Sequence, residues 1–422
     1  MMKSCSDLMR MIKSAEGMTR MVQLYGSREG EVARQMERYM LLLKRHEDLF
    51  GTEKMPLLVS APGRTELCGN HTDHNNGRVL AAAVNLDTVA AVSPRDDLQI
   101  TLHSEGFAPI RVDLNNLSPV KEEQGTPASI IRGIAARMQE MGCMVRGFDG
   151  TATSNVLSGS GLSSSAAFEV LMGRIINGLY FENRLSPVEI AQIGQYAENV
   201  YYGKPSGLMD QMASSVGGLV FIDFNDPKMP VVEKVDYDFA HSGYTLCTID
   251  AGADHADLTD EYAAIPAEMK QVARFFGKEV LREVDEKEFY KEIAELRKET
   301  GDRAVLRAIH FFNENRRVQM QVRALKNDNF DAFLHYVNES GMASWTLLQN
   351  VTPAGYIEKQ DMAFTIALCQ QLLAGEGAVR IHGGGFAGTA LAFVPNEKFE
   401  QFKTAIEAAL GSGCCHKLAI TE

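Results

Sequence analysis

The spacing of apolar residues predicts a helical start to the chain, followed by a strand-rich stretch. Between Val32 and Phe50 apolar residues recur at helical intervals with Lys and Arg between them, so residues 1 to about 50 are expected to be helical. Over residues 57–92 LLVSAPGR reads as an apolar strand ending at Pro-Gly, NHTDHNNG as a turn-rich loop, and VLAAAVNLDTVAAV as further apolar strands. Residues 97–113 alternate as two paired strands would.

Further along, helices and strands follow one another without a regular βαβ order. Helices are expected over Ala128 to Met141, Pro187 to Tyr201, most of Asp260 to Asn338, and Glu397 to Leu410. LVFIDF, YTLCTID and both arms of AVRIHGGGFAGTALAFV read as strands. This irregular mixture favours the α+β class. The helical pattern of residues 1–50 predicts an N-terminal helical extension. The change from strand-rich to helix-rich sequence near residue 240 predicts a boundary between domains over residues 51–240 and 241–422.

Composition excludes several classes of binding partner and indicates the cellular compartment. The 422 residues exceed one ordinary core, which favours two domains, and the net charge of -13 disfavours nucleic acid and anionic membranes as partners. No apolar run approaches the ~20 residues of a membrane span, and the charged N-terminus does not resemble a signal peptide. Seven scattered cysteines without a CxxC pair are typical of reduced thiols rather than of disulfides or a zinc site. These features predict a cytoplasmic protein.

A Gly/Ser loop, LSGSGLSSSAA over Leu157 to Ala167, follows a predicted strand and opens a long helix. Such a loop exposes backbone N–H groups at the positive end of the helix dipole, which makes an anion site. Ser163, Ser164 and Ser165 add hydroxyls that can donate to phosphate oxygens or ligate Mg²⁺. The loop is neither GxxxxGK[ST] nor GxGxxG, because the lysine and the third glycine are missing. A serine-rich helix cap without a ligand is the alternative.

The segment APGRTELCGNHTDHNNG, over residues 61–77, gathers polar side chains between apolar strands. Asn70, His71 and Asp73 are suitable partners for sugar hydroxyls, which need paired donors and acceptors. Arg64 stands at a strand end, where it could steady the charge of a transferring phosphoryl group. A polar hairpin with side-chain-capped turns is the alternative interpretation.

A third segment, Gly383 to Gly388, matches GxGxxG but lacks the context of a dinucleotide site. It runs into the predicted strand TALAFV rather than a helix, and the chain ends soon afterwards. A dinucleotide unit needs a helix there and an acidic residue about 20 positions on. We therefore reject a dehydrogenase on this loop and expect a backbone-dense turn that approaches another group closely, such as the nucleotide phosphates.

Taken in order, the three segments resemble the signature regions of galactokinases and their relatives in the GHMP kinase superfamily. AENVYYGKPSGLMDQ, EYAAIPAEMKQVARFFG and AIHFFNENRRV also resemble family segments, so the resemblance runs from about residue 50 to the C-terminus. It implies a two-domain α+β fold with an N-terminal mixed sheet and a C-terminal ferredoxin-like α/β sandwich. It also implies ATP and Mg²⁺ as cofactors and the reaction of galactose with ATP to galactose 1-phosphate and ADP, in a monomer or weak homodimer.

The resemblance assigns roles to single positions. Asp210 is expected to be the general base, or the carboxylate that orients the anomeric hydroxyl, with Arg64 as its partner. Ser165 and Glu198 match the Mg²⁺ ligands. The sugar-contacting positions are matched by Asn70, His71, Asp73, Gly207 and Tyr262. The ATP loop is matched by Ser158, Gly159, Ser160, Gly161, Leu162, Ser163, Ser164, Ser165 and Ala166. A buried cap for Asp210 and a surface carboxylate for Glu198 are the alternatives.

Several positions depart from the family pattern and put the substrate in doubt. The family has Glu in place of Asn70 and usually Tyr in place of His74, so Asn70→Glu is expected to improve galactose use if Asn70 changes the specificity. Cations of the family are replaced by Asp254, Ile265 and Pro266. The aromatic pair that sandwiches adenine in relatives falls at Pro127 and Ile130. Two other functions therefore stay open, a kinase of another sugar or polyol and a non-catalytic regulator that responds to sugar and ATP.

Overall fold

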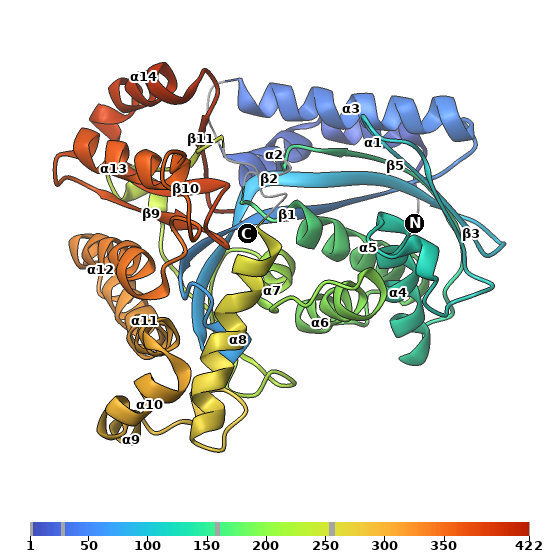
Figure 1. The fold of residues 1–422 in the computed structure, drawn as a ribbon. Helices are drawn as coiled ribbons and strands as arrows, with labels where there is room; N and C mark the ends of the chain where they lie inside the picture. Colours follow the sequence, from blue (N-terminus) through green and yellow to red (C-terminus); the bar gives the residue numbers. More distant parts are fainter. Residues whose placement is uncertain (1–2, 27–29, 157–160, 253–257, 422) are drawn as a thin grey trace.

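The computed structural model describes residues 3–26, 30–156, 161–252 and 258–421, whose strands form two separate sheets (Figure 1). The first sheet has seven strands and is mixed, and the second has four antiparallel strands, as the α+β prediction requires. The strands of the first sheet are β1 (Leu57–Cys68), β2 (Arg78–Pro94), β3 (Gln99–Ser104), β4 (Ile110–Asp113), β5 (Phe148–Ser154), β6 (Leu219–Asp223) and β7 (Val231–Lys234). Those of the second are β8 (Tyr244–Asp250), β9 (Ala378–His382), β10 (Thr389–Pro395) and β11 (Cys415–Lys417).

Strand β2 organises the first sheet. It pairs with β1 on one side and with β5 and β6 on the other, while β3 and β5 run parallel. Val89 and Ala91 are buried on one face of β2, and Ala90 and Val92 are buried on the other. A strand covered on both faces needs an unbroken apolar run, which explains the sequence VLAAAVNLDTVAAV.

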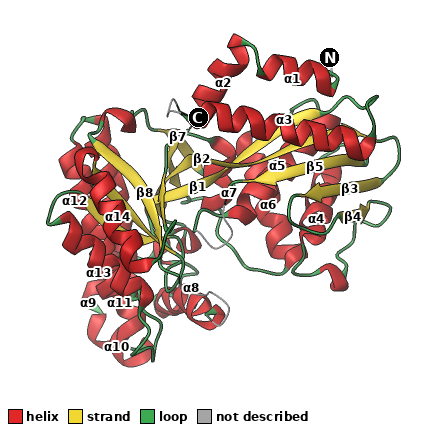
Figure 2. Cartoon of the chain, turned by 90° about the horizontal axis from the view of Figure 1, so that it is seen from above, coloured by secondary structure: helices red, strands yellow, loops and turns green. Residues whose placement is uncertain are grey.

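Helices cover the two faces of the first sheet (Figure 2). The N-terminal extension packs around Val89 and Ala91, and the opposite face is covered by four helices that carry much of the polar sequence described above. The first group is α1 (Cys5–Ile12), α2 (Ala15–Tyr25) and α3 (Glu31–Phe50), and the second is α4 (Pro127–Glu140), α5 (Ser164–Tyr180), α6 (Pro187–Ala197) and α7 (Met209–Val216).

The helix-rich second half is joined to the first sheet by a shared core. Leu80 of β2, Val318, Phe333 and Phe393 belong to one buried apolar cluster, so the two sheets are held together through their helices. The helices here are α8 (Thr259–Phe275), α9 (Glu286–Lys291), α10 (Ile293–Thr300), α11 (Asp302–Lys326), α12 (Phe330–Ala343), α13 (Asp361–Leu373) and α14 (Phe399–Leu410). The last two pack on the four-stranded sheet. Residue 240 lies between the strands of the two sheets, and the division into domains stays a prediction.

Three elements differ from their predicted bounds. The N-terminal extension is three helices rather than one, because Ser4 and Ser14 each cap a new helix start. Strand β1 does not end at Pro62 and Gly63 but continues to Cys68, with irregular register at Pro62/Arg64 that absorbs the proline. Helix α6 ends at Ala197 and is followed by a π-helical turn over Glu198–Tyr202. Among the described helices, none combines the length and apolar character needed to cross a membrane.

Candidate active site

The centre of the site is an ion pair between Arg64 of β1 and Asp210 in the first turn of α7. The guanidinium is bidentate, with Nε 2.7 Å from Oδ1 of Asp210 and one terminal nitrogen 2.9 Å from Oδ2. Ser163 donates its hydroxyl to the same Oδ2 at 2.7 Å. Burial alone would raise the pKa of Asp210, but Arg64 and Ser163 outweigh it and hold that pKa below its usual range. Asp210 is therefore an ionised acceptor held in one orientation.

The predicted anion site begins beside this pair. Helix α5 starts at Ser164, and no side chain of the described residues caps it, because the Ser163 hydroxyl is used by Asp210. Gly161 accepts a hydrogen bond from Arg64 through its carbonyl oxygen, and Ser165 is exposed in the first turn. The helix start therefore presents unused N–H groups next to Asp210. Of the ATP-loop positions, Leu162 and Ala166 are buried, while Leu157, Ser158, Gly159 and Ser160 lie outside the described residues.

A second group of carboxylates lies behind Ser165. Gln211 donates its amide to Glu169 at 2.8 Å and to Glu198 at 3.0 Å, which brings the two acids together. Burial, and after it the charge of Glu198, raise the pKa of Glu169 well above its ordinary value. One oxygen of Glu169 is buried with no hydrogen-bond partner. Lys204 compensates Glu198 with Nζ 3.3 Å from its Oε1. The pair of acids is thus incompletely neutralised.

The sugar-loop residues meet the segment before α7 and the glycine turn between β9 and β10. Asp73 fits against Gly207, where an added Cβ would come within 1.8 Å of its carboxylate, so only glycine allows this approach. His71, in the left-handed region with φ 59°, lies 2.8 Å through Nε2 from the carbonyl oxygen of Gly384. Burial, then neighbouring His74, lower the pKa of His71 to about 3, so the ring is neutral.

Tyr262 of α8 closes the other side of the glycine turn. Its hydroxyl donates to the carbonyl oxygen of Gly385 at 2.7 Å, and its ring packs edge-on against Phe386. An added Cβ at Gly384 would lie 2.8 Å from the ring. The turn is therefore the predicted backbone-dense turn between two strands, and its close neighbours are His71 and Tyr262.

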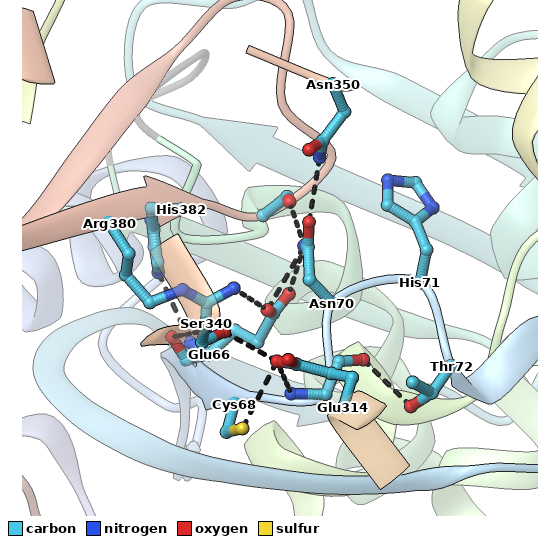
Figure 3. A network of polar contacts seen from close by, with 12 residues as sticks. Glu66, Cys68, Asn70, His71, Thr72, Glu314, Ser340, Asn350, Arg380 and His382 are labelled. Atoms are coloured by element: carbon cyan, nitrogen blue, oxygen red, sulfur yellow. Dashed lines mark hydrogen bonds and ion pairs between the residues drawn. The ribbon is translucent and has the colours of Figure 1, made fainter. Parts of the chain in front are cut away.

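Asn70 is wholly buried and its amide is held by protein groups (Figure 3). It donates to both oxygens of Glu66, at 3.1 and 3.2 Å, and to the carbonyl oxygen of Gly383 at 2.6 Å. Its own oxygen accepts from the amide of Asn350 at 2.7 Å. Because this geometry ties Asn70 to the glycine turn, it supports a positioning role, and direct contact with a sugar stays a prediction.

The same network spans both halves of the molecule. Glu66, 1% exposed, pairs with Arg380 of β9, 0% exposed, at 2.5 Å (Figure 3). Just past the end of β1, the backbone N–H of Gly69 donates to Glu314 of α11 at 3.0 Å, and Glu314 also accepts from the hydroxyl of Ser340 at 2.6 Å. The network therefore fixes the sugar loop to the second sheet and to α11.

The departures from the family pattern lie in different surroundings. Ile265 is fully buried in the apolar core around α8, and Pro266 lies inside that helix. Both side chains are uncharged, so neither replaces the cation of the family pattern. His74 stacks on His71 with ring centroids 5.9 Å apart. Pro127 opens α4, and Ile130 is buried in the first core. Asp254 lies outside the described residues.

Sequence reasoning missed four residues of the site, Glu169, Lys204, Gln211 and Arg380. Lys204 stands in the quoted segment AENVYYGKPSGLMDQ, whose excess of acidic and amide residues was a signal for a local cation. Arg380 gave no such signal, because its partner Glu66 is 314 residues away.

Comparisons with known proteins agree with this geometry. Residues 44–94 match the family model described as the galactokinase galactose-binding signature, and residues 129–218 match the GHMP kinases N terminal domain. A galactokinase of Glaesserella parasuis is 32% identical over 362 residues, covering 82% of this chain and 88% of that protein. One of Streptomyces coelicolor is 31% identical over 376 residues, covering 87% of this chain and 92% of that protein.

Solved structures show the same fold. The crystal structure of Lactococcus lactis galactokinase complexed with galactose superposes with a TM-score of 0.77 at 25% identity, covering 90% of this chain and 97% of that one. The mevalonate kinase of Methanococcus jannaschii gives a TM-score of 0.61 at 15% identity, covering 87% of this chain and 99% of that one. The second likeness concerns the fold alone.

Proposed function

The chain belongs to the galactokinase family of the GHMP kinase superfamily, and on that premise we propose that the Arg64–Asp210 site transfers the terminal phosphoryl group of ATP to the anomeric hydroxyl of galactose. Its activity is that of a galactokinase, a phosphotransferase that acts on an alcohol group of the sugar. The observation that carries the assignment to these residues is the fixed Asp210 carboxylate beside the open start of α5.

Asp210 orients the acceptor hydroxyl. A carboxylate whose pKa lies below its usual range is a weak base, and phosphoryl transfer needs little proton abstraction before the bond to phosphorus forms. The Asp210 oxygens therefore accept a hydrogen bond from the hydroxyl and align its lone pair with the phosphorus atom, and they take the proton late. Arg64 keeps the carboxylate in place and contributes positive charge next to the transferring group.

ATP is the phosphoryl donor of a GHMP kinase, and its phosphates fit the start of α5. The N–H groups at Ser164 and Ser165 and the helix dipole point toward the space beside Asp210. Ala166 and Ala167 are buried and keep the first turn slim, which lets a phosphate approach the backbone closely.

The residues expected to hold Mg²⁺ have suitable chemistry. The Ser165 hydroxyl is exposed, the Glu198 carboxylate is paired only with Lys204 and Gln211, and both supply the oxygen ligands that Mg²⁺ prefers. The described residues contain no group of three metal-ligating side chains, so a bound ion would need nucleotide phosphates as further ligands. When bound, Mg²⁺ would neutralise charge on the phosphates. Ser165 and Glu198 would hold it, and Glu169 and Gln211 orient Glu198.

Lys204 supplies the cation that the family pattern places elsewhere. Its backbone N–H bonds to the Glu198 carbonyl oxygen at 3.1 Å, and its ammonium lies near Glu198 and interacts with the charges of Asp210 and Glu169. Since Ile265 is buried and uncharged, Lys204 and Arg64 are the cations that flank Asp210 in the described structure. We assign Lys204 to neutralising the phosphates of bound ATP.

The acceptor side is formed by His71, Asp73, Gly207 and Tyr262. Asp73 provides acceptors for hydroxyl groups. The Nε2–H of neutral His71 donates to the Gly384 carbonyl oxygen, which leaves Nδ1 as a further acceptor, and Gly207 leaves room beside them. Asn70 fixes this loop from behind. Contact of these residues with galactose is the proposal, and the monomer or weak homodimer and the cytoplasmic location remain predictions.

A panel of acceptors tests the proposal. ADP release would be measured with galactose, glucose, mannose, N-acetylgalactosamine and myo-inositol at fixed MgATP. We expect the largest kcat/KM with galactose, by about tenfold or more, which corresponds to about 1.4 kcal/mol of transition-state preference. Turnover confined to another sugar or polyol would move the assignment to that acceptor. Thermal stabilisation by sugar and ATP without ADP release would identify a regulator instead.

A further inference from the structure

A cavity of about 490 Å³ lies between the N-terminal helices and the edge strand β1. Its volume falls in the range of small-molecule sites, about 300–1,000 Å³. None of the residues assigned above to catalysis or to sugar and ATP binding lines it. It therefore requires its own explanation, separate from phosphoryl transfer.

The walls of the cavity are apolar and adaptable. They are formed by Met11, Ile12, Met21 and Leu24 of the N-terminal helices and by Leu58 and Val84 of the sheet. Methionine side chains adjust to irregular shapes, so such a wall accepts a flexible apolar body. Polar residues, among them Ser14, Tyr25 and Ser60, complete the lining.

One charged group enters this apolar space without a counterion. Arg174 of α5 donates to the backbone carbonyl oxygens of Ser60 at 2.6 Å and Ser215 at 2.9 Å. In the part of the chain that the structure describes, no carboxylate forms an ion pair with it, and burial lowers the pKa of Arg174. A guanidinium removed from water without an anionic partner costs free energy, which a bound anion would recover.

The acidic residue deep in the cavity is already neutralised by other groups. Asp87 pairs with Arg38 at 2.7 Å and accepts hydrogen bonds from Tyr25 and Ser60. Glu16 and Arg20 line the cavity from exposed turns of α2, where water screens them. The uncompensated charge inside the cavity is therefore positive.

We propose that this cavity binds a small amphipathic monocarboxylate, with its carboxylate on Arg174 and its hydrocarbon chain along the methionine-lined wall. The apolar walls account for the chain, and the guanidinium without a counterion accounts for the acid. Such a ligand would touch β1 two residues before Arg64 and the end of α7, whose first turn carries Asp210, since Pro62 and Val216 also line the cavity. The proposal does not depend on the identity of the sugar.

Three probes with one hydrocarbon chain and different head groups test it. Octanoate, 1-octanol and octylamine would be titrated into the full chain by calorimetry. We expect one octanoate per chain, bound about tenfold more tightly than octanol, and octylamine weaker than both. Equal affinities for octanoate and octanol, or no saturable binding of octanoate, would overturn the proposal.

Variants distinguish binding through the carboxylate from binding through the hydrocarbon chain alone. Arg174→Met should abolish the preference for octanoate over octanol, and Arg174→Lys should keep part of it. Arg184→Met, an exposed arginine paired with Glu182, is the matched control and should change nothing. If Arg174→Met does not fold, Met21→Trp decides, because it fills the cavity and should abolish binding of both probes. Undiminished octanoate binding in Met21→Trp would contradict the site.

Discussion

Two groups of carboxylates in this protein lie close together and are built in opposite ways. In the cluster of Asp210, Glu198 and Glu169, the Asp210 side chain is 32% exposed and its Lys204 neighbour 63% exposed, and one Glu169 oxygen has no partner. In the network of Glu66 and Glu314, each carboxylate has a buried or half-buried arginine and further hydrogen bonds. We call these the open cluster and the closed network.

This difference assigns catalysis and ligand binding to the open cluster and structural stability to the closed network. An open, incompletely neutralised cluster gains free energy when a cationic metal and a phosphate-bearing ligand arrive, whereas both carboxylates of the closed network are already paired with arginines. The closed network instead crosses from β1 to β9 and α11 and fixes the sugar loop between the two halves. Changes in the open cluster should therefore alter turnover, and changes in the closed network should alter stability first.

The largest effect is expected from Asp210→Asn. The amide cannot accept the hydroxyl proton and presents only one acceptor, so turnover with galactose should fall about 10³-fold. Stability should fall less than in a fully buried pair, because the Asp210 side chain is partly exposed although the buried Arg64 loses its counterion. Asp226→Asn, on an exposed turn, is the control for loss of a surface charge. A turnover of Asp210→Asn within tenfold of the unmodified protein would remove Asp210 from the chemistry.

Arg380→Met should have the largest effect on stability. It leaves Glu66 buried without its cation, so the free energy of unfolding measured with urea should fall by about 3–5 kcal/mol. The exposed pair of Arg297 and Asp302 provides the comparison, since solvent screens it and Arg297→Met should have a much smaller effect on stability. If the two variants lose similar amounts, the closed network is not a stabilising clamp.

Asn70→Glu should destabilise the protein rather than improve galactose use. A second carboxylate would stand about 3 Å from Glu66 inside the closed network, at an expected cost of about 2–3 kcal/mol. Adding Glu66→Asn exchanges the two groups and should restore most of the loss. An increase in kcat/KM for galactose by Asn70→Glu alone would support the specificity role expected from the sequence instead.

Lys204→Met should weaken the use of ATP more than of sugar. Loss of one cation from the open cluster should lower kcat/KM for MgATP about tenfold, with a matching loss in the affinity for MgADP measured by calorimetry. Lys228→Met removes an exposed lysine from a distant turn and should leave both values unchanged. Unaltered nucleotide binding in Lys204→Met would show that the lysine serves Glu198 alone.

The smallest effect concerns acid pH and the closed network. Burial, and then Arg64 and Arg380, hold the pKa of His382 well below its ordinary value, so the folded protein keeps this ring neutral. The unfolded chain takes up the proton below about pH 6.5. The stability contributed by neutral His382 is therefore present above pH 6.5 and is lost as pH falls toward the folded pKa. By contrast, the pKa of Asp210 is lowered, so Asp210 stays ionised over this pH range.

Urea unfolding between pH 6.5 and 5 measures this loss. His382→Gln should reduce the slope of unfolding free energy against pH by up to about 1.4 kcal/mol per pH unit, the value for one proton. His46, His71 and His310 also have lowered pKa values, so part of the slope should remain. An unchanged slope in His382→Gln would mean that His382 is not the neutral group.

The sequence predicted local features better than contacts between distant segments. The glycine turn between two strands followed from GGGFAG entering TALAFV, and the helix start at Ser164 followed from a serine-rich loop opening a helix. The binding of an anion at that helix start stays a prediction. The closed network could not be predicted, because Glu66 and Arg380 are brought together only by the packing of two sheets. The continuation of β1 past Pro62 was also missed, because a bulge at the sheet edge accommodates a residue that normally ends a strand.

The Arg64–Asp210 pair came from the family resemblance and not from spacing, and the structure shows it as a bidentate contact. The resemblance also placed Asn70 at the sugar, whereas its amide is held by Glu66, Gly383 and Asn350. Contact of Asn70 with the sugar stays a prediction, and its hydrogen-bond partners depend on what else is buried there.

The position of the phosphate on the product tests whether Asp210 directs the anomeric hydroxyl of galactose toward ATP. Galactose and MgATP would be incubated with the protein and followed by ³¹P NMR, with proton coupling used to identify the esterified carbon. We expect a single sugar phosphate bonded at the anomeric carbon, formed together with ADP and absent with Asp210→Asn. A phosphate on another hydroxyl would contradict the proposed role of Asp210. So would ADP release from ATP at an undiminished rate when Asp210→Asn is incubated with galactose.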